Sequence, residues 1–101
     1  MIAIRKQDGR YASVVVCDEC GAVITDAFDA MEVSSSAPEG ATAQAFHVHK
    51  GACDDAMSAR LGGMHGSEEL AVHLVSLLKN ALSESDRQRV ENLLKWSDRE
   101  A

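Results

Sequence analysis

The first sixteen residues carry apolar side chains on both sides of a short polar break. Ile2 and Ile4 precede the pair Asp8-Gly9, and a largely apolar run over residues 11–16 follows it. β-Branched and aromatic residues favour strands, and Asp-Gly readily adopts the positive φ angles of a type I′ turn. The pattern therefore predicts a β-hairpin at the amino terminus.

The middle of the chain alternates between short apolar segments and polar breaks. Residues 22–33 are moderately typical of β-structure and predict two short strands with a bend near residues 26–29. Residues 34–44 are polar and contain the one proline of the chain, which predicts a loop.

The segment "AFHVHK" shows the two-residue period of a strand. Phe46 and Val48 are expected on one face of this strand, and His47 and His49 on the other. Gly51 permits a sharp turn into a short helix, which is predicted over residues 53–61 and ends at a glycine pair.

The carboxy-terminal third has the period of helices. Ser67 and Ser83 are predicted to cap two helices, over residues 67–82 and 83–97. Apolar side chains cover far more of the first helix than the ~100° band of an ordinary surface helix, whereas they form only a narrow stripe on the second. The first helix must therefore also pack on the β-rich part, on another copy of itself, or on both.

Composition and charge narrow the functional classes. The formal net charge is −6, from 10 Lys and Arg against 16 Asp and Glu. An acidic surface repels phosphate, which disfavours a nucleic-acid partner without excluding it. No apolar run approaches the ~20 residues that span a bilayer, so no membrane partner is expected.

The amino-terminal residues and the number of cysteines indicate the cellular compartment in which the protein is expected. "MIAIRK" reaches charged residues too soon for the apolar core of a signal peptide. Three cysteines cannot all pair off within one chain. Together these features predict a cytoplasmic protein with free or metal-bound thiols.

Two close pairs of potential metal ligands stand out. Cys17-x2-Cys20 precedes Gly21, and His49-x3-Cys53 follows much later in the chain. Structural zinc sites commonly take four soft or borderline ligands as two such pairs, and a two-residue spacing lets one tight turn aim both sulfurs at one point. The pattern predicts a zinc site. A redox dithiol, a disulfide and an iron–sulfur cluster explain the full set of ligands less well.

The order strand, CxxCG, strand, then a second ligand pair entering a short helix resembles a treble-clef zinc finger, with zinc ribbons a close second. The resemblance covers roughly residues 12–61. It implies that Cys17, Cys20, His49 and Cys53 bind one Zn²⁺. The second pair is HxxxC rather than the usual CxxC, so His47, two residues earlier on the same strand face, is the alternative ligand.

The expected architecture is a small α+β protein with a zinc-stapled β-rich module followed by an αα-hairpin. The β-rich module, with its hairpin, zinc knuckle and short helix, is assigned to residues 1–61, a glycine-rich hinge to 62–66 and the helical hairpin to 67–101. His65 and His73 are expected to lie outside any site.

The expected function is that of a protein–protein interaction or regulatory module with a structural zinc ion. Its surface would be the apolar face of the helix over residues 68–82, either for another protein or for a homodimer. Catalysis is not expected, because HExxH and the zinc deaminase signature are absent.

Two alternatives remain open. The first is a nucleic-acid-binding finger that uses Arg5, Lys6 and Arg10 near the hairpin turn, with Lys50 beside the site. The second is redox sensing, in which oxidation of the thiolates releases the metal.

Overall fold

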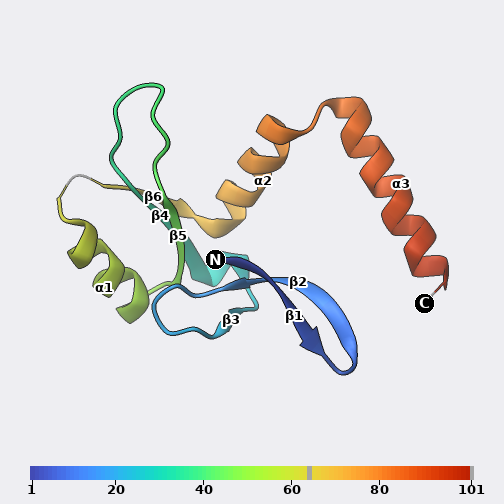
Figure 1. Ribbon diagram of the computed structural model, residues 1–101, viewed down its shortest axis with the longest axis horizontal. Coiled ribbons are helices and arrows are strands. Elements are labelled where there is room, and N and C mark those ends of the chain that lie inside the picture. The colour runs from blue at the N-terminus through green and yellow to red at the C-terminus, as the bar shows by residue number, and fades with distance from the viewer. Residues whose placement is uncertain (64, 101) are drawn as a thin grey trace.

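The computed structural model describes the backbone of residues 1–63 and 65–100 and the side chains of residues 1–63 and 65–95. These residues form two three-stranded antiparallel sheets and three α-helices (Figure 1). The elements are β1 (Ile2–Gln7), β2 (Arg10–Val16), β3 (Val23–Ile24), the 3₁₀ turn η1 (Ala27–Asp29), β4 (Ala30–Ser35), β5 (Ala45–His49), α1 (Ala52–Leu61), β6 (His65–Glu69), α2 (Leu70–Ala81) and α3 (Glu84–Glu100). The predicted α+β class is confirmed.

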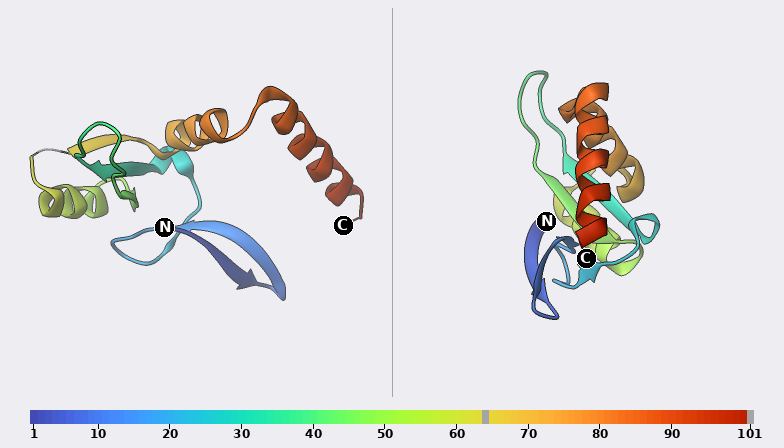
Figure 2. Two further views of the ribbon diagram at one scale, coloured as in Figure 1. Left: turned by 45° about the horizontal axis from the view of Figure 1, so that its top comes forward. Right: turned by 90° about the vertical axis from the view of Figure 1, so that its right-hand side faces the viewer.

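The first sheet, in the order β1-β2-β3, contains the predicted hairpin. Gln7 pairs with Arg10 across a two-residue turn. Asp8 has a φ of 51° and Gly9 a φ of 78°, as a type I′ turn requires. The hairpin extends away from the rest of the molecule (Figures 1 and 2), and Ile4 on it is 73% exposed.

The second sheet, in the order β5-β4-β6, has one apolar and one polar face. Val33 and Val48 pack with Met57 of α1 in the buried core. The alternation of strand side chains places Glu32 and His47, which are paired in register, on the opposite face. α1 packs against β4 and β5 beneath the sheet, whereas α2 continues from the end of β6 and contacts β4, β6 and η1 (Figure 2). His73 of α2 lies near His47 on the polar face.

Residues 65–69 differ from the sequence prediction, which placed them in a hinge and in the first turn of a helix. They form β6, in which Ser67 pairs with Val33 of β4. Because the backbone of Ser67 is engaged by a neighbouring strand, its predicted role as a helix cap is wrong. The helix begins instead at Leu70, whose side chain is only 1% exposed.

The two carboxy-terminal helices meet at a short link. Ser83 Oγ accepts a hydrogen bond from the Asp86 N–H at 3.2 Å, which confirms the predicted cap. α2 packs against β4 and η1, whereas α3 turns away from α2 and projects from the molecule (Figures 1 and 2). The predicted αα-hairpin is therefore open, because the narrow apolar stripe of α3 offers too little area to close over α2.

Candidate metal centre

Cys17 and Cys20 lie in a tight turn directly after β2. The Cys17 N–H donates to the Ala22 carbonyl at 2.8 Å, and the Gly21 N–H donates to the Cys17 carbonyl at 2.9 Å. Gly21 adopts a φ of 78°, a left-handed conformation that costs glycine little. The Cys20 N–H points at Cys17 Sγ, 3.5 Å away. The turn thus folds back on the first sulfur, as the CxxCG spacing predicts.

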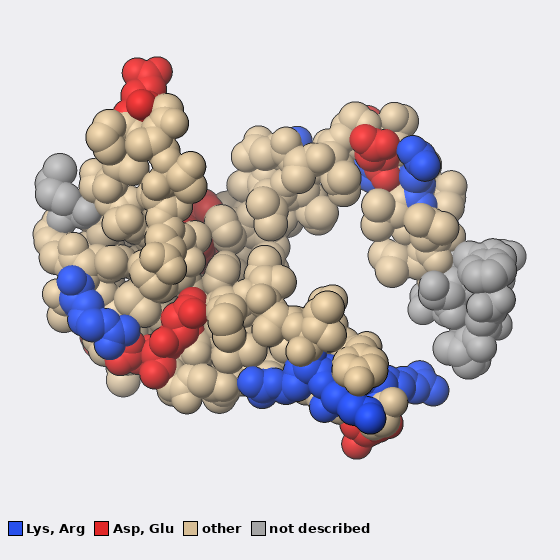
Figure 3. Space-filling view, in the orientation of Figure 1, with Lys and Arg blue, Asp and Glu red and all other residues tan. Residues whose placement is uncertain are grey.

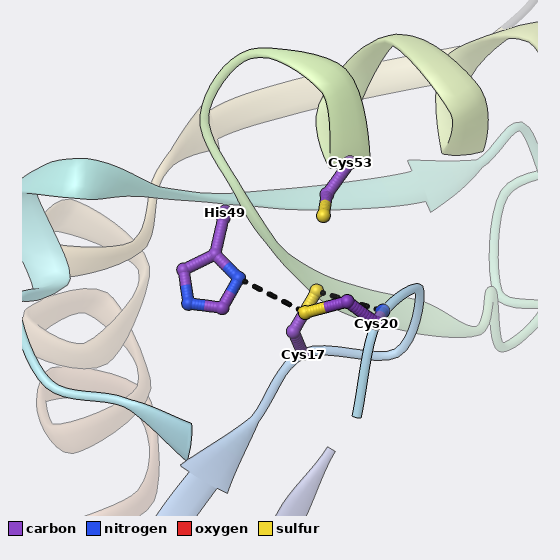
Figure 4. A group of neighbouring side chains, drawn as sticks. All are labelled: Cys17, Cys20, His49 and Cys53. Atoms are coloured by element: carbon purple, nitrogen blue, oxygen red, sulfur yellow. Dashed lines mark hydrogen bonds between the residues drawn. The ribbon is translucent and has the colours of Figure 1, made fainter. Parts of the chain in front are cut away.

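His49 and Cys53 approach the same point from the other side of the chain. His49 is the last residue of β5, and Cys53 is the second residue of α1. Gly51 reverses the backbone between them with a φ of 88°. Figure 4 shows both side chains pointing toward the two cysteines of the turn.

The four ligand atoms form one compact group. The three Sγ atoms and one ring nitrogen of His49 all lie within 4.8 Å of one another. Cys20 Sγ and His49 Nδ1 are 3.5 Å apart, and all three cysteines are free thiols. Zn–S bonds of about 2.3 Å and Zn–N bonds of about 2.0 Å place the sulfur and nitrogen ligands of a tetrahedral site about 3.5–3.8 Å apart. Cys17, Cys20, His49 and Cys53 can therefore hold a metal ion after small side-chain movements.

The cysteines of this group differ electrostatically. Burial by itself raises the pKa of Cys17, but the backbone N–H groups of Cys20, His49 and Glu19 outweigh it and lower that pKa to about 6. Burial, together with the nearby sulfurs of Cys17 and Cys20, raises the pKa of Cys53 to about 11. Three adjacent sulfurs therefore resist becoming thiolates together unless a cation joins them.

His47, the alternative ligand, lies outside this group. Its Nδ1 accepts a hydrogen bond from the Met1 nitrogen at 2.8 Å. Its backbone N–H donates to Asp18 Oδ2 at 2.8 Å, which ties β5 to the cysteine turn. Of the two histidines on this strand face, the structure brings His49 to the sulfurs.

The two histidines are expected to respond differently to substitution. His49→Ala removes a ligand, so Co²⁺ binding should weaken by more than the about 10–100-fold that changes outside the ligand shell cause. His47→Ala should leave the intensity of the sulfur-to-cobalt charge-transfer absorption unchanged. Titration of the metal-free variants with Co²⁺, followed at that band, measures both. A His47→Ala protein without the band would show that the ligand was assigned to the wrong histidine.

Sequence reasoning missed a second group of side chains of the types that can hold a metal ion. Ligand atoms of Glu32, Glu68 and His73 also lie within 4.8 Å of one another. The three residues come from β4, β6 and α2, and no local motif connects them. His73, which the sequence placed outside any site, therefore belongs to a cluster that only the tertiary fold assembles.

The comparisons with known proteins identify no relative of this chain. No helix in the described part of the chain combines the length and the apolar character needed to cross a bilayer. No protein-family model matches the chain, and no curated protein or solved structure matches it at a significant level. The treble-clef resemblance therefore stays a prediction based on ligand type and spacing.

Proposed function

We propose that Cys17, Cys20, His49 and Cys53 bind one Zn²⁺ ion and that this ion is structural. The support is the donor set, because three sulfurs and one imidazole are ligands that zinc takes in closed four-coordinate sites. Four protein ligands leave no position for water or substrate, and three thiolates make the ion a poor Lewis acid. On this proposal the centre is not catalytic.

The place of the ligands in the fold supports a structural role. One ion would join the end of β2, the end of β5 and the start of α1, and so link both sheets to a helix. Cys17 is itself part of the core cluster with Val33, Val48 and Met57, which is small. Small cores commonly need a metal or another cross-link to be stable.

We propose further that the protein is an interaction module that uses an apolar groove between α2 and α3. Val75, Leu78 and Leu82 line the groove on one side, and Val90 and Leu94 on the other. All of these except Leu82 are 40–60% exposed. Contiguous exposed apolar side chains of this kind mark interaction surfaces.

A second copy of the chain is the occupant that we propose for this groove. α3 projects from the rest of the molecule (Figure 1), and its apolar residues Val90, Leu93 and Leu94 are exposed. Most of the stability of helices in proteins comes from packing of such an apolar face. A twofold arrangement would bury the stripe of each α3 against the groove of the other copy. The ion pairs Arg87–Glu84 and Arg89–Asp86 place both charge signs along the first turns of α3, so the polar side of this helix is not a block of like charge. The mass of the wild-type particle in solution tests this proposal.

The β1–β2 hairpin supports a second candidate function, the binding of single-stranded nucleic acid. Arg5, Lys6 and Arg10 are exposed on it, and Figure 3 shows Lys and Arg gathered over this hairpin. The Lys6 ammonium lies 5.8 Å from the centre of the Tyr11 ring, and that ring is 75% exposed. Exposed aromatic rings beside cationic side chains are features of single-strand-binding surfaces. The overall charge of −6 opposes this function.

If the hairpin binds single strands, a labelled oligonucleotide should shift in a gel at low salt and be released as salt rises. Replacement of Arg5, Lys6 and Arg10 by Ala should abolish the shift, whereas replacement of Arg87 and Arg89 on α3 by Ala should not. Absence of a shift for the wild type at low salt would eliminate this candidate.

A further inference from the structure

A row of ionisable side chains crosses the polar face of the second sheet, next to the first turns of α2. Glu32 on β4 lies directly opposite His47 on β5 and directly opposite Glu68 on β6. His73 of α2 contacts this row of side chains, with its Nδ1 3.1 Å from Glu68 Oε1. None of these four residues is a ligand of the thiolate centre.

Two carboxylates are brought together here, and one of them is buried. Glu32 is only 6% exposed, and like charges directly opposite each other on neighbouring strands are destabilising. Burial, with a contribution from Glu68, raises the pKa of Glu32, and only His73 among the nearby charges opposes this. A cation between the carboxylates would offset both the burial and the repulsion.

The donors are arranged so that one ion can reach all of them. One carboxylate oxygen from each of Glu32 and Glu68 and one ring nitrogen of His73 lie within 4.8 Å of one another. The side chains of Glu68 and His73 are 38% and 23% exposed, so the cluster is open to solvent on one side. An ion can enter from that side without unfolding the sheet.

His47 provides an independent indication of a ligand. Its side chain is 8% exposed, and its Nε2 is buried without a hydrogen-bond partner within the described residues. Because Nδ1 accepts from the Met1 nitrogen, Nε2 carries the ring proton and is a donor that lacks an oxygen acceptor. The His47 and His73 rings lie side by side, with their centres 5.8 Å apart. An oxygen held over the cluster would satisfy this donor.

We propose that Glu32, Glu68 and His73 form a second metal site, for a divalent first-row transition metal with oxygen and nitrogen ligands. Carboxylates and imidazole suit Mn²⁺ and Fe²⁺, whereas thiolates favour softer ions such as the Zn²⁺ proposed for the thiolate centre. Three protein ligands leave at least one position for water, and the His47 Nε2–H donates to that water. His47 is thus a positioning residue. The ion joins α2 to β4 and β6, and so holds the helix on the sheet.

Mn²⁺ is the probe that separates this site from the thiolate centre. Protein with one Zn²⁺ per chain in the thiolate centre is titrated with Mn²⁺, and free Mn²⁺ is measured by electron paramagnetic resonance. We expect one Mn²⁺ per chain, with an enhanced water-proton relaxation rate because water remains on the ion. Glu32→Gln and Glu68→Gln should abolish this binding, and His47→Ala should weaken it about 10–100-fold.

Glu69→Gln is the matched control, because Glu69 follows Glu68 on β6 and pairs instead with Lys50 at 3.4 Å. It should bind Mn²⁺ as the wild type does. Glu68→Gln removes the more exposed carboxylate, so it keeps the test valid if Glu32→Gln fails to fold. Equal Mn²⁺ affinity in wild type and Glu68→Gln, or no binding by wild type at millimolar Mn²⁺, would overturn the proposal and leave His73 and Glu68 an ordinary hydrogen-bonded pair. Neither result bears on the thiolate centre, whose Zn²⁺ content is counted separately.

Discussion

Removal of the metal from the thiolate centre is expected to unfold the β-rich part of the protein. Structural zinc contributes apparent binding free energy on the order of 10 kcal/mol, which is comparable to the whole stability of a typical small domain. The core cluster of this chain is small and includes the ligand Cys17. We therefore expect the chelated protein to lose its cooperative thermal transition, as followed by circular dichroism, and to regain it when Zn²⁺ is restored.

Cys20→Ser should reproduce the effect of the chelator. Cys20 is exposed, so its replacement by the similar serine leaves no cavity in the core, and a large destabilisation must come from the lost ligand. Glu19→Gln, in the same turn, is the control: it weakens only the partly exposed Glu19–Arg60 ion pair, which is worth about 1 kcal/mol or less. A chelated protein with the melting temperature of the metal-bound form would contradict a structural role for the ion.

The features that the sequence predicts correctly depend on local signals. Asp8 and Gly9 favour a type I′ turn through their own backbone preferences, and this turn pairs the two strands that flank it as a hairpin. The close pairs Cys17/Cys20 and His49/Cys53 are each set by one turn, so their spacing can be recognised without a fold. The expectation that the two pairs meet comes from the common use of two close ligand pairs in structural zinc sites. The structure brings their ligand atoms within 4.8 Å of one another.

The features that the sequence does not predict depend on contacts between residues far apart in the chain. His65–Glu69 has no large apolar residue and two acidic ones, so nothing in its composition indicates a strand. It is a strand because β4 presents an unpaired edge to it. The Glu32–Glu68–His73 cluster depends on the same pairing and is therefore invisible in the sequence. Strand alternation put His47 and His49 on one face, but only the contact of His47 with Met1 and Asp18 separates their roles.

The oligomeric state connects this fold to its proposed function. α2 is held on the second sheet at Leu70, while its later turns expose Val75, Leu77 and Leu78. Packing on the sheet therefore buries only part of the wide apolar surface of α2. Of the exposed residues, Val75 and Leu78 line the groove between α2 and α3, so the proposed dimer would bury part of the apolar surface that one chain leaves exposed.

Leu78→Asp is expected to convert a wild-type dimer into a monomer. Burial of the half of Leu78 that one chain leaves exposed contributes about 1 kcal/mol. Twofold symmetry removes this contribution twice, and an unpaired carboxylate in the interface adds at least about 1 kcal/mol, so the dimer should lose about 3 kcal/mol or more. This corresponds to an increase of about 100-fold or more in the dissociation constant. Light scattering coupled to size-exclusion chromatography over a range of concentrations measures it.

Asn80→Asp is the matched control for this substitution. It adds the same charge two residues away on α2, but Asn80 is not among the residues that line the groove, so the dimer should persist. Leu78 is 50% exposed within one chain, so the Leu78→Asp monomer should stay folded and keep the sulfur-to-cobalt absorption of the thiolate centre. A wild type that is monomeric at high concentration, or a Leu78→Asp variant that still dimerises, would exclude this groove as the surface for a second copy.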